Sequence, residues 1–139
     1  LGQERDDSSL FEKNLVIPTK KKLTPNQTST GLFAWKVAKH TKSNAIVVAK
    51  NNKIISISGG QTSRVDATKI AFEKTKIPKG CVVASDAFFP FKDSIEAMAH
   101  YKIAAIVQPG GSIRDAEVIR SCNKNKIAMA FTGYRVFKH

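Results

Sequence analysis

The fold of this chain is organised around the stretch Cys81-Val82-Val83-Ala84-Ser85-Asp86-Ala87-Phe88-Phe89-Pro90-Phe91-Lys92-Asp93. Its first four residues are apolar and β-rich, which predicts a short buried strand. Asp93 and Glu96 have the spacing of a capping box, so a helix is expected to begin at Asp93. Three phenylalanines crowd the turn between strand and helix. At least one ring is expected to face the core, and a stacking surface for a flat heterocycle is the alternative interpretation.

Strand and helix patterns alternate on both sides of this stretch. The other predicted elements are an edge strand at 15–17, a helix at 24–40, strands at 44–50 and 54–58, helices at 63–76 and 93–101, a strand at 103–107, a helix from 112 to about 123 and a strand at 127–131. The helix at 24–40 has a capping Thr24 and an apolar face that includes Phe33, Ala34 and Ala38. A hairpin followed by alternating helices and strands predicts an α/β fold with a mixed sheet, largely parallel in its second half.

Length and composition limit the classes of protein to which the chain can belong. The 139 residues suit one domain, and the content of 42% hydrophobic and 24% charged residues is typical of globular proteins. No apolar stretch approaches the ~20 residues of a membrane span. The chain begins with Leu1 rather than Met, which we interpret as a fragment or a processed product. Cys81 and Cys122 lack metal spacing and indicate buried thiols in a reducing compartment.

The chain is strongly basic, with a formal net charge of +12 and a pI near 9.9. Such a charge favours polyanions in general, including nucleic acid, membranes and phosphorylated small molecules. The basic residues are spread along the chain apart from the run Lys20-Lys21-Lys22, so the charge alone does not identify the partner.

Three helix starts follow strand ends with capping spacing: Ser63-x-x-Asp66, Asp93-x-x-Glu96 and Ser112-x-x-Asp115. In parallel α/β sheets these positions open on one edge, where helix dipoles favour anions. A site is therefore expected from residues 59–64, 86–93 and 109–112. Arg64 would oppose the dipole of its helix, so either a bound anion or plain solvation explains it. The 109–112 segment is either a simple turn or an anion-holding loop.

Longer motifs resemble one enzyme family. They are Lys42-Ser43-Asn44-Ala45-Ile46-Val47, Gly60-Gln61-x-Ser63-Arg64-Val65, Ser85 to Asp93, Gln108-Pro109-Gly110-Gly111-Ser112-Ile113-Arg114-Asp115 and Phe131-Thr132-Gly133-x-Arg135-x-Phe137-x-His139. In this order and spacing they resemble the AICAR transformylase/IMP cyclohydrolase family of purine biosynthesis. Residues 1–139 look like the C-terminal part of the transformylase domain, a single domain without the upstream half and without the cyclohydrolase domain.

The resemblance implies a cytidine-deaminase-like three-layer α/β/α fold. It implies formyl transfer from the cosubstrate 10-formyltetrahydrofolate to AICAR, whose product the other domain of the parent enzyme closes to IMP. It further implies a cytoplasmic homodimer that handles small molecules, with no nucleic acid and no membrane as partner. The zinc motifs of the deaminases, His-x-Glu and Cys-x-x-Cys, are absent from the sequence, so no metal ligands are assigned.

The resemblance also assigns roles to individual residues. Asn44 and His139 match catalytic positions, Asn44 near the reacting amine. Substrate-binding positions are matched by Arg64 and Arg135, which contact the anionic nucleotide, and by Phe88, Phe91, Asp93 and Phe137, which line the nucleotide and folate pockets. Thr41, Ser43 and Asp86 resemble the surroundings of a potassium (K+) site.

Two departures from the family pattern bear on activity. Lys92 stands where many members have Arg, and the Lys-His pair assigned to proton transfer is absent from this chain. The isolated chain is therefore expected to have little or no activity. Two other functions stay open: a basic nucleic-acid-binding module, and a non-catalytic ligand-binding α/β domain.

Overall fold

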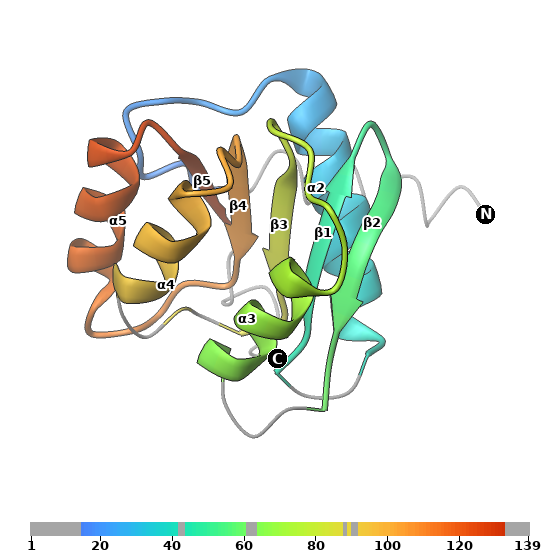
Figure 1. Ribbon diagram of the computed structural model, residues 1–139. Helices are drawn as coiled ribbons and strands as arrows, with labels where there is room; N and C mark the ends of the chain where they lie inside the picture. The colour runs from blue at the N-terminus through green and yellow to red at the C-terminus, as the bar shows by residue number, and fades with distance from the viewer. Residues whose placement is uncertain (1–14, 42–43, 61–63, 88, 90–91, 133–139) are drawn as a thin grey trace.

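Five strands form one mixed sheet in this computed structural model, with helices on both of its faces (Figure 1). The structure describes residues 15–41, 44–60, 64–87, 89 and 92–132, and at 64 and 65 the backbone alone. In chain order the elements are α2 (Pro25–Lys39), β1 (Ile46–Lys50), β2 (Lys53–Ser58), α3 (Arg64–Glu73), β3 (Val82–Ser85), α4 (Lys92–Ala99), β4 (Ala105–Gln108), α5 (Asp115–Lys124) and β5 (Ala128–Phe131).

The strand order β2-β1-β3-β4-β5 confirms the predicted mixed sheet. β1 is antiparallel to β2 and β3, while β3, β4 and β5 run parallel. Asn51 and Asn52 both have a positive φ, as a two-residue hairpin turn requires. The predicted edge strand at 15–17 is longer than the pairing that the structure shows. It is an isolated bridge between Val16 and Phe131, because Pro18 lacks the N–H that would extend the pairing.

One face of the sheet is covered by α2, whose start is as predicted: Gln27 N–H donates to Thr24 Oγ1 at 3.1 Å, and Thr24 N–H to Gln27 Oε1 at 3.0 Å. This helix lies very close to the sheet, since a Cβ on Gly31 would come within 2.6 Å of Val107. The expectation for Phe33 was wrong, because its side chain is 40% exposed. The buried face does contain Ala34 and Ala38, as predicted, together with Gly31, Leu32 and Trp35.

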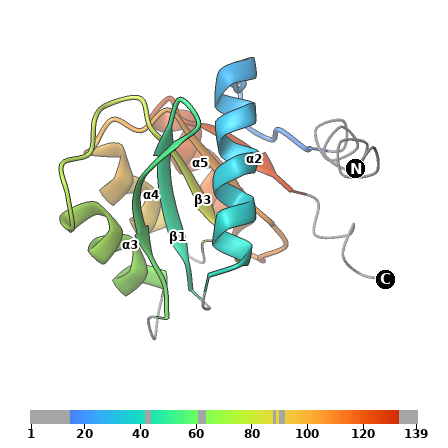
Figure 2. The ribbon, with the colours of Figure 1, turned by 90° about the vertical axis from the view of Figure 1, so that its right-hand side faces the viewer.

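The other face is covered by α3, α4 and α5, and Figure 2 shows the sheet between these helices and α2. Its core includes Phe72, Ile95, Met98 and Met129, and also Phe89, which is fully buried. One ring of the aromatic turn therefore faces inward, as predicted. The result is a three-layer α/β/α arrangement, as the family resemblance implied.

Two helices begin elsewhere than their capping patterns suggested. α4 begins at Lys92, which places Asp93 in the first turn rather than at the cap. α5 begins at Asp115, three residues after the predicted start at Ser112, and its N-cap Arg114 makes no side-chain capping bond. The other ends differ by amounts usual for helix and strand boundaries. Across the described residues, none of the helices has the length and apolar composition needed to span a membrane.

Candidate functional site

One edge of the sheet gathers the strand ends and helix starts to which the sequence pointed. Ile46 pairs with both Ser58 and Ser85, and Gln108 pairs with Phe131. The amino end of β1 and the carboxyl ends of the other four strands therefore lie along one side of the sheet, at the bottom of Figure 1. Open α/β sheets bind ligands outside the carboxyl ends of their strands. We call residues 44–46, 58–60, 85–87, 89, 108–112 and 131–132 the site edge.

Asn44 lies at the start of the site edge in a left-handed conformation, with φ of 60°. Asparagine tolerates this conformation better than most residues. The next residue is held from the neighbouring strand, because Ala45 N–H donates to Asp86 Oδ1 at 3.2 Å. Asp86 is half-buried and directly follows β3. Two residues singled out from the sequence, Asn44 before β1 and Asp86 after β3, thus lie at the ends of adjacent strands at the same edge.

Gln108 is the fully buried amide at the centre of the site edge. Its Oε1 accepts a hydrogen bond from Phe89 N–H at 2.8 Å, and its Nε2 donates to Met129 Sδ at 3.1 Å. Its main-chain oxygen accepts from Thr132 N–H at 2.8 Å. One side chain therefore fixes the aromatic turn after β3, and the same residue fixes the end of β5. This role could not be predicted from the sequence, since nothing local to Gln108 indicates its distant partners.

In the turn after β4, three N–H groups already donate to side chains. Asp115 accepts hydrogen bonds from Gly111 N–H at 2.8 Å and Ser112 N–H at 3.2 Å, and Arg114 N–H donates to Ser112 Oγ at 3.1 Å. Within the 109–112 segment, the Gly111 and Ser112 N–H groups are therefore not available to hold an anion. Gly110 has a φ of +80°, and a Cβ there would come within 2.9 Å of the Phe131 ring.

A cavity of about 420 Å³ lies between α3 and α4. Its lining residues are Thr68, Lys69, Phe72, Glu73, Asp93, Ser94, Ala97, Met98, His100 and Tyr101. The floor is aromatic, because the rings of Phe72 and Tyr101 lie with centroids 4.8 Å apart. Asp93, exposed in the first turn of α4, contributes a carboxylate to the lining. The volume is within the range of small-molecule pockets, about 300–1,000 Å³.

The cavity contains one residue that the resemblance had singled out, Asp93, and several that sequence reasoning missed. Thr68 and Phe72 are four residues apart on α3, and Ser94 and Met98 are four apart on α4. This spacing indicates that each pair shares a helix face. It does not show that the two faces enclose a space, which depends on how the helices pack.

The other predicted site residues are only partly placed. Arg64 begins α3, so its backbone lies at the helix start beside the site edge as predicted, while its side chain is outside the described part. The remaining predictions fall on residues outside the described ranges: Ser43, Phe88, Phe91, Arg135, Phe137 and His139.

Oxygen-bearing side chains near the start of β1 bear on the predicted potassium site. Within the described ranges, no cluster of His, Cys, Asp and Glu side chains could hold a metal ion. K+ prefers oxygen atoms, and Asp86 supplies a carboxylate beside the start of β1. Thr41 Oγ1 donates to Val37 O at 2.8 Å, which still leaves lone pairs on the hydroxyl. Thr41 and Asp86 therefore supply oxygen atoms of the kind that K+ binds.

The two cysteines are buried and free. Burial raises the pKa of the Cys122 thiol to about 12. Burial also raises the pKa of Cys81, against a smaller opposing effect of Lys50. Neither thiol is a nucleophile at neutral pH, because the thiolate is the reactive form.

The family model and the relatives found by comparison with known proteins agree with one another. A family model described as AICARFT/IMPCHase bienzyme matches residues 1–74. The bifunctional purine biosynthesis protein PurH of Aquifex aeolicus is 55% identical over 138 residues, which cover 96% of this chain and 27% of that protein. The PurH proteins of Persephonella marina and Anoxybacillus flavithermus are 50% and 49% identical over all of this chain, and again 27% of their own length is covered. The chain thus spans 27% of the length of these relatives.

Proposed function

Since the chain belongs to the AICARFT/IMPCHase bienzyme family, we propose that it is the C-terminal part of the AICAR transformylase domain of a bifunctional purine-biosynthesis enzyme. In this proposal it supplies part of the site for AICAR and 10-formyltetrahydrofolate, and the parent enzyme works as a cytoplasmic homodimer. The observation that carries the proposal is the site edge itself, where Asp86 holds the residue after Asn44 and where α3 begins beyond the end of β2.

The proposed reaction joins the 5-amino nitrogen of AICAR to the formyl carbon of the folate. The nitrogen attacks the carbon, the carbon–N10 bond breaks, and a proton passes from the attacking amine to N10 of the departing tetrahydrofolate. The amine of AICAR is a weak nucleophile, so the transfer needs a base and a group that polarises the formyl oxygen. We assign both tasks mainly to the part of the parent enzyme that lies upstream of this chain.

Within this chain, Asn44 is proposed to orient the amine and His139 to lie near the reacting atoms. Asn44 suits that task because its position is fixed. The Ala45–Asp86 hydrogen bond holds the start of the strand against β3. Arg64 and Arg135 are proposed to bind the nucleotide. The residues proposed to line the nucleotide and folate pockets are Asp93, Phe88, Phe91 and Phe137.

The cavity between α3 and α4 supports the proposed placement of the folate. It brings Asp93 together with an aromatic floor, and carboxylates beside rings suit a flat heterocycle that carries N–H donors. K+ is proposed as a structural ion near Thr41, Ser43 and Asp86.

The proposal is tested by comparing two proteins: this chain alone, and this chain joined to the upstream part of the Aquifex aeolicus relative. Formyl transfer is followed by the absorbance change as tetrahydrofolate forms. Loss of the base and the polarising group should leave the isolated chain at least about 10⁴-fold slower. The joined protein should recover turnover. Fast turnover by the isolated chain would contradict the assignment of half a site, and an inactive but folded joined protein would contradict the proposed function.

A further inference from the structure

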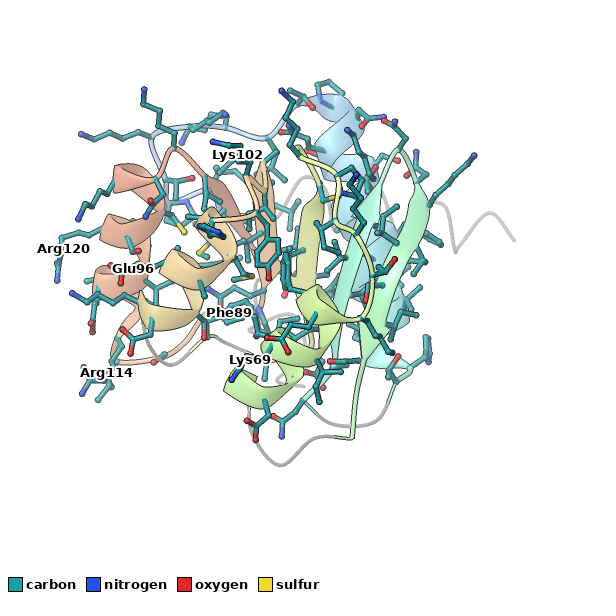
Figure 3. The ribbon with its side chains drawn as sticks, in the orientation of Figure 1. Lys69, Phe89, Glu96, Lys102, Arg114 and Arg120 are labelled. Atoms are coloured by element: carbon teal, nitrogen blue, oxygen red, sulfur yellow. The ribbon has the colours of Figure 1, made fainter. Side chains whose placement is uncertain are left out.

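The end of the sheet opposite the site edge is covered by lysines. Its loops comprise residues 19–22, 50–53, 74–80, 100–104 and 123–127, and none of them contains an Asp or a Glu. The exposed lysines in these loops whose side chains make no hydrogen bond or ion pair in the described part of the chain are Lys20, Lys21, Lys53, Lys76, Lys79, Lys102, Lys124 and Lys126. We call this set the lysine row. In Figure 3, Lys102 lies at this end and Lys69 and Arg114 lie toward the other.

The lysine row follows the order of the strands beneath it. Lys53 begins β2, and Lys79, Lys102 and Lys126 each lie just before β3, β4 and β5. Neighbouring strands are about 4.8 Å apart, so five strands make a row of roughly 20 Å. The charges are therefore spaced along a line rather than gathered at one point.

Hydrogen bonds between the loops hold the row in place. Lys50 Nζ donates to Lys79 O at 2.8 Å, and Gly80 N–H donates to Lys102 O at 2.8 Å. At the β5 side, Lys20 N–H donates to Asn123 Oδ1 at 2.9 Å. Each loop is thus tied to a neighbour, and the lysine side chains extend from fixed positions.

The chemistry of this surface does not suit a protein partner. Interfaces between proteins have an apolar centre and are depleted in lysine. The large hydrophobic side chains that are exposed in the described part are Val16, Phe33, Ile70 and Ile113, and none lies in these loops. The exposed residues beside the lysines include Asn51, Asn52 and Thr75. A polar, strongly positive surface is typical of contacts with nucleic acid.

We propose that the lysine row binds the phosphate backbone of duplex DNA without regard to base sequence. Lysine is a point charge that suits phosphate, whereas base reading commonly uses bidentate arginine. A duplex is favoured over a single strand, because single strands need exposed aromatic rings on which bases stack, and Tyr101 is half-buried. This surface lies at the end of the sheet opposite the site edge, and the loop 100–104 is the part of it that also borders the cavity between α3 and α4. The proposal departs from the expectation that nucleic acid is no partner.

The test measures fluorescence anisotropy of a labelled duplex of about 20 base pairs, titrated with the 139-residue chain at several KCl concentrations. We expect a micromolar Kd near 50 mM KCl and a slope of log K against log salt of about −4, for four to five phosphates contacted. Absence of binding at that salt would overturn the proposal. Tighter binding of single-stranded DNA of equal length, or of poly-L-glutamate, would overturn it as well.

Two pairs of substitutions distinguish the effect of the lysine row on binding from the effect of the net charge. Lys102→Gln with Lys126→Gln should make the salt slope shallower by about 2 and weaken binding roughly tenfold. Lys69→Gln with Lys92→Gln removes the same charge near the other end and should leave the slope unchanged. Equal effects of the two pairs would mean that the whole charge acts and not the row, which would contradict the proposal. Circular dichroism melting curves verify that both pairs fold.

Discussion

The two ends of the sheet use polar residues in opposite ways. At the site edge, polar groups are drawn into hydrogen bonds with the backbone of other segments, as when Gln108 accepts from Phe89 N–H. At the opposite end, the side chains of the lysine row extend into water. The first arrangement fixes the positions of atoms and suits orientation of a substrate. The second provides charge without fixed geometry and suits a uniform polyanion.

The chain offers the same residue types at both ends, which makes the comparison testable. Glycines with positive φ occur at Gly110 and Gly80, and left-handed asparagines at Asn44 and Asn51. A glutamine that bonds to a backbone N–H occurs at the site edge and also at the start of α2, at the lysine end of the sheet. Identical substitutions at the two ends should therefore have unequal effects.

The largest stability difference is expected for Gly110→Ala against Gly80→Ala. Both place a Cβ at a positive φ, which costs about 1–2 kcal/mol. At Gly110 the new Cβ would also lie 2.9 Å from the Phe131 ring, whereas at Gly80 its nearest neighbour is the end of Lys50 at 3.7 Å. Overpacking adds about 1–3 kcal/mol. Urea unfolding should show that Gly110→Ala is the more destabilised, and equal losses would refute close packing at the site edge.

Substitutions of the two asparagines should differ in their effect on catalysis. In the protein joined to the upstream part of the Aquifex aeolicus relative, Asn44→Gly keeps the backbone conformation and removes only the amide. A lost orienting contact should lower kcat/KM for formyl transfer about 100-fold. Asn51→Gly makes the same change in the hairpin turn, where it should leave kcat/KM unaltered. A similar kcat/KM for the two variants would remove Asn44 from the site.

The two glutamines should differ in their effect on stability. Gln108→Met fills a similar volume but leaves a buried Phe89 N–H without its acceptor, at a cost of about 2 kcal/mol. Gln27→Met frees an exposed Thr24 N–H that water can reach, so its cost should be only about 0.5 kcal/mol. Denaturant melts of both variants measure the difference, and a larger loss for Gln27→Met would show that Gln108 anchors nothing.

The smallest expected effect concerns the thiols. Lys50 lowers the pKa of Cys81 against the larger effect of burial. Lys50→Gln removes that charge, so the pKa should rise, the thiolate fraction should fall, and alkylation by iodoacetamide at pH 8 should slow about twofold. Cys122, whose pKa is raised to about 12 by burial alone, serves as the internal reference. Mass spectrometry follows both sites, and faster alkylation of Cys81 in the variant would contradict the stated sign.

Local sequence signals predicted much of the fold. The Thr24 capping box and the Asn51-Asn52 turn depend on neighbours in the chain, so their patterns were sufficient. The buried face of α2 was misjudged at Phe33, because the close contact between Gly31 and Val107 selects the face, and this contact joins residues far apart in sequence.

The candidate site was less predictable. Its edge followed from the alternation of elements, and the placement of Asn44, Asp86 and the α3 start there agrees with the pattern. The cavity around Asp93 and the anchoring by Gln108 arise only when separate elements pack together. The role of the 109–112 turn was decided by Asp115, whose carboxylate takes two of the N–H groups that an anion would need.

The most direct measurement is an amide-resolved NMR titration of the isotopically labelled chain with AICAR and a non-reactive folate analogue. If the site edge is part of the nucleotide and folate site, the largest shifts will fall on the amides of Ala45, Phe89 and the α4 start, and Lys102 and Lys126 will barely move. AICAR carries a phosphate that either end of the sheet could attract. The titration therefore compares binding at the site edge directly with binding at the lysine row. Shifts concentrated on the loops of the lysine row, with an unchanged site edge, would contradict the account.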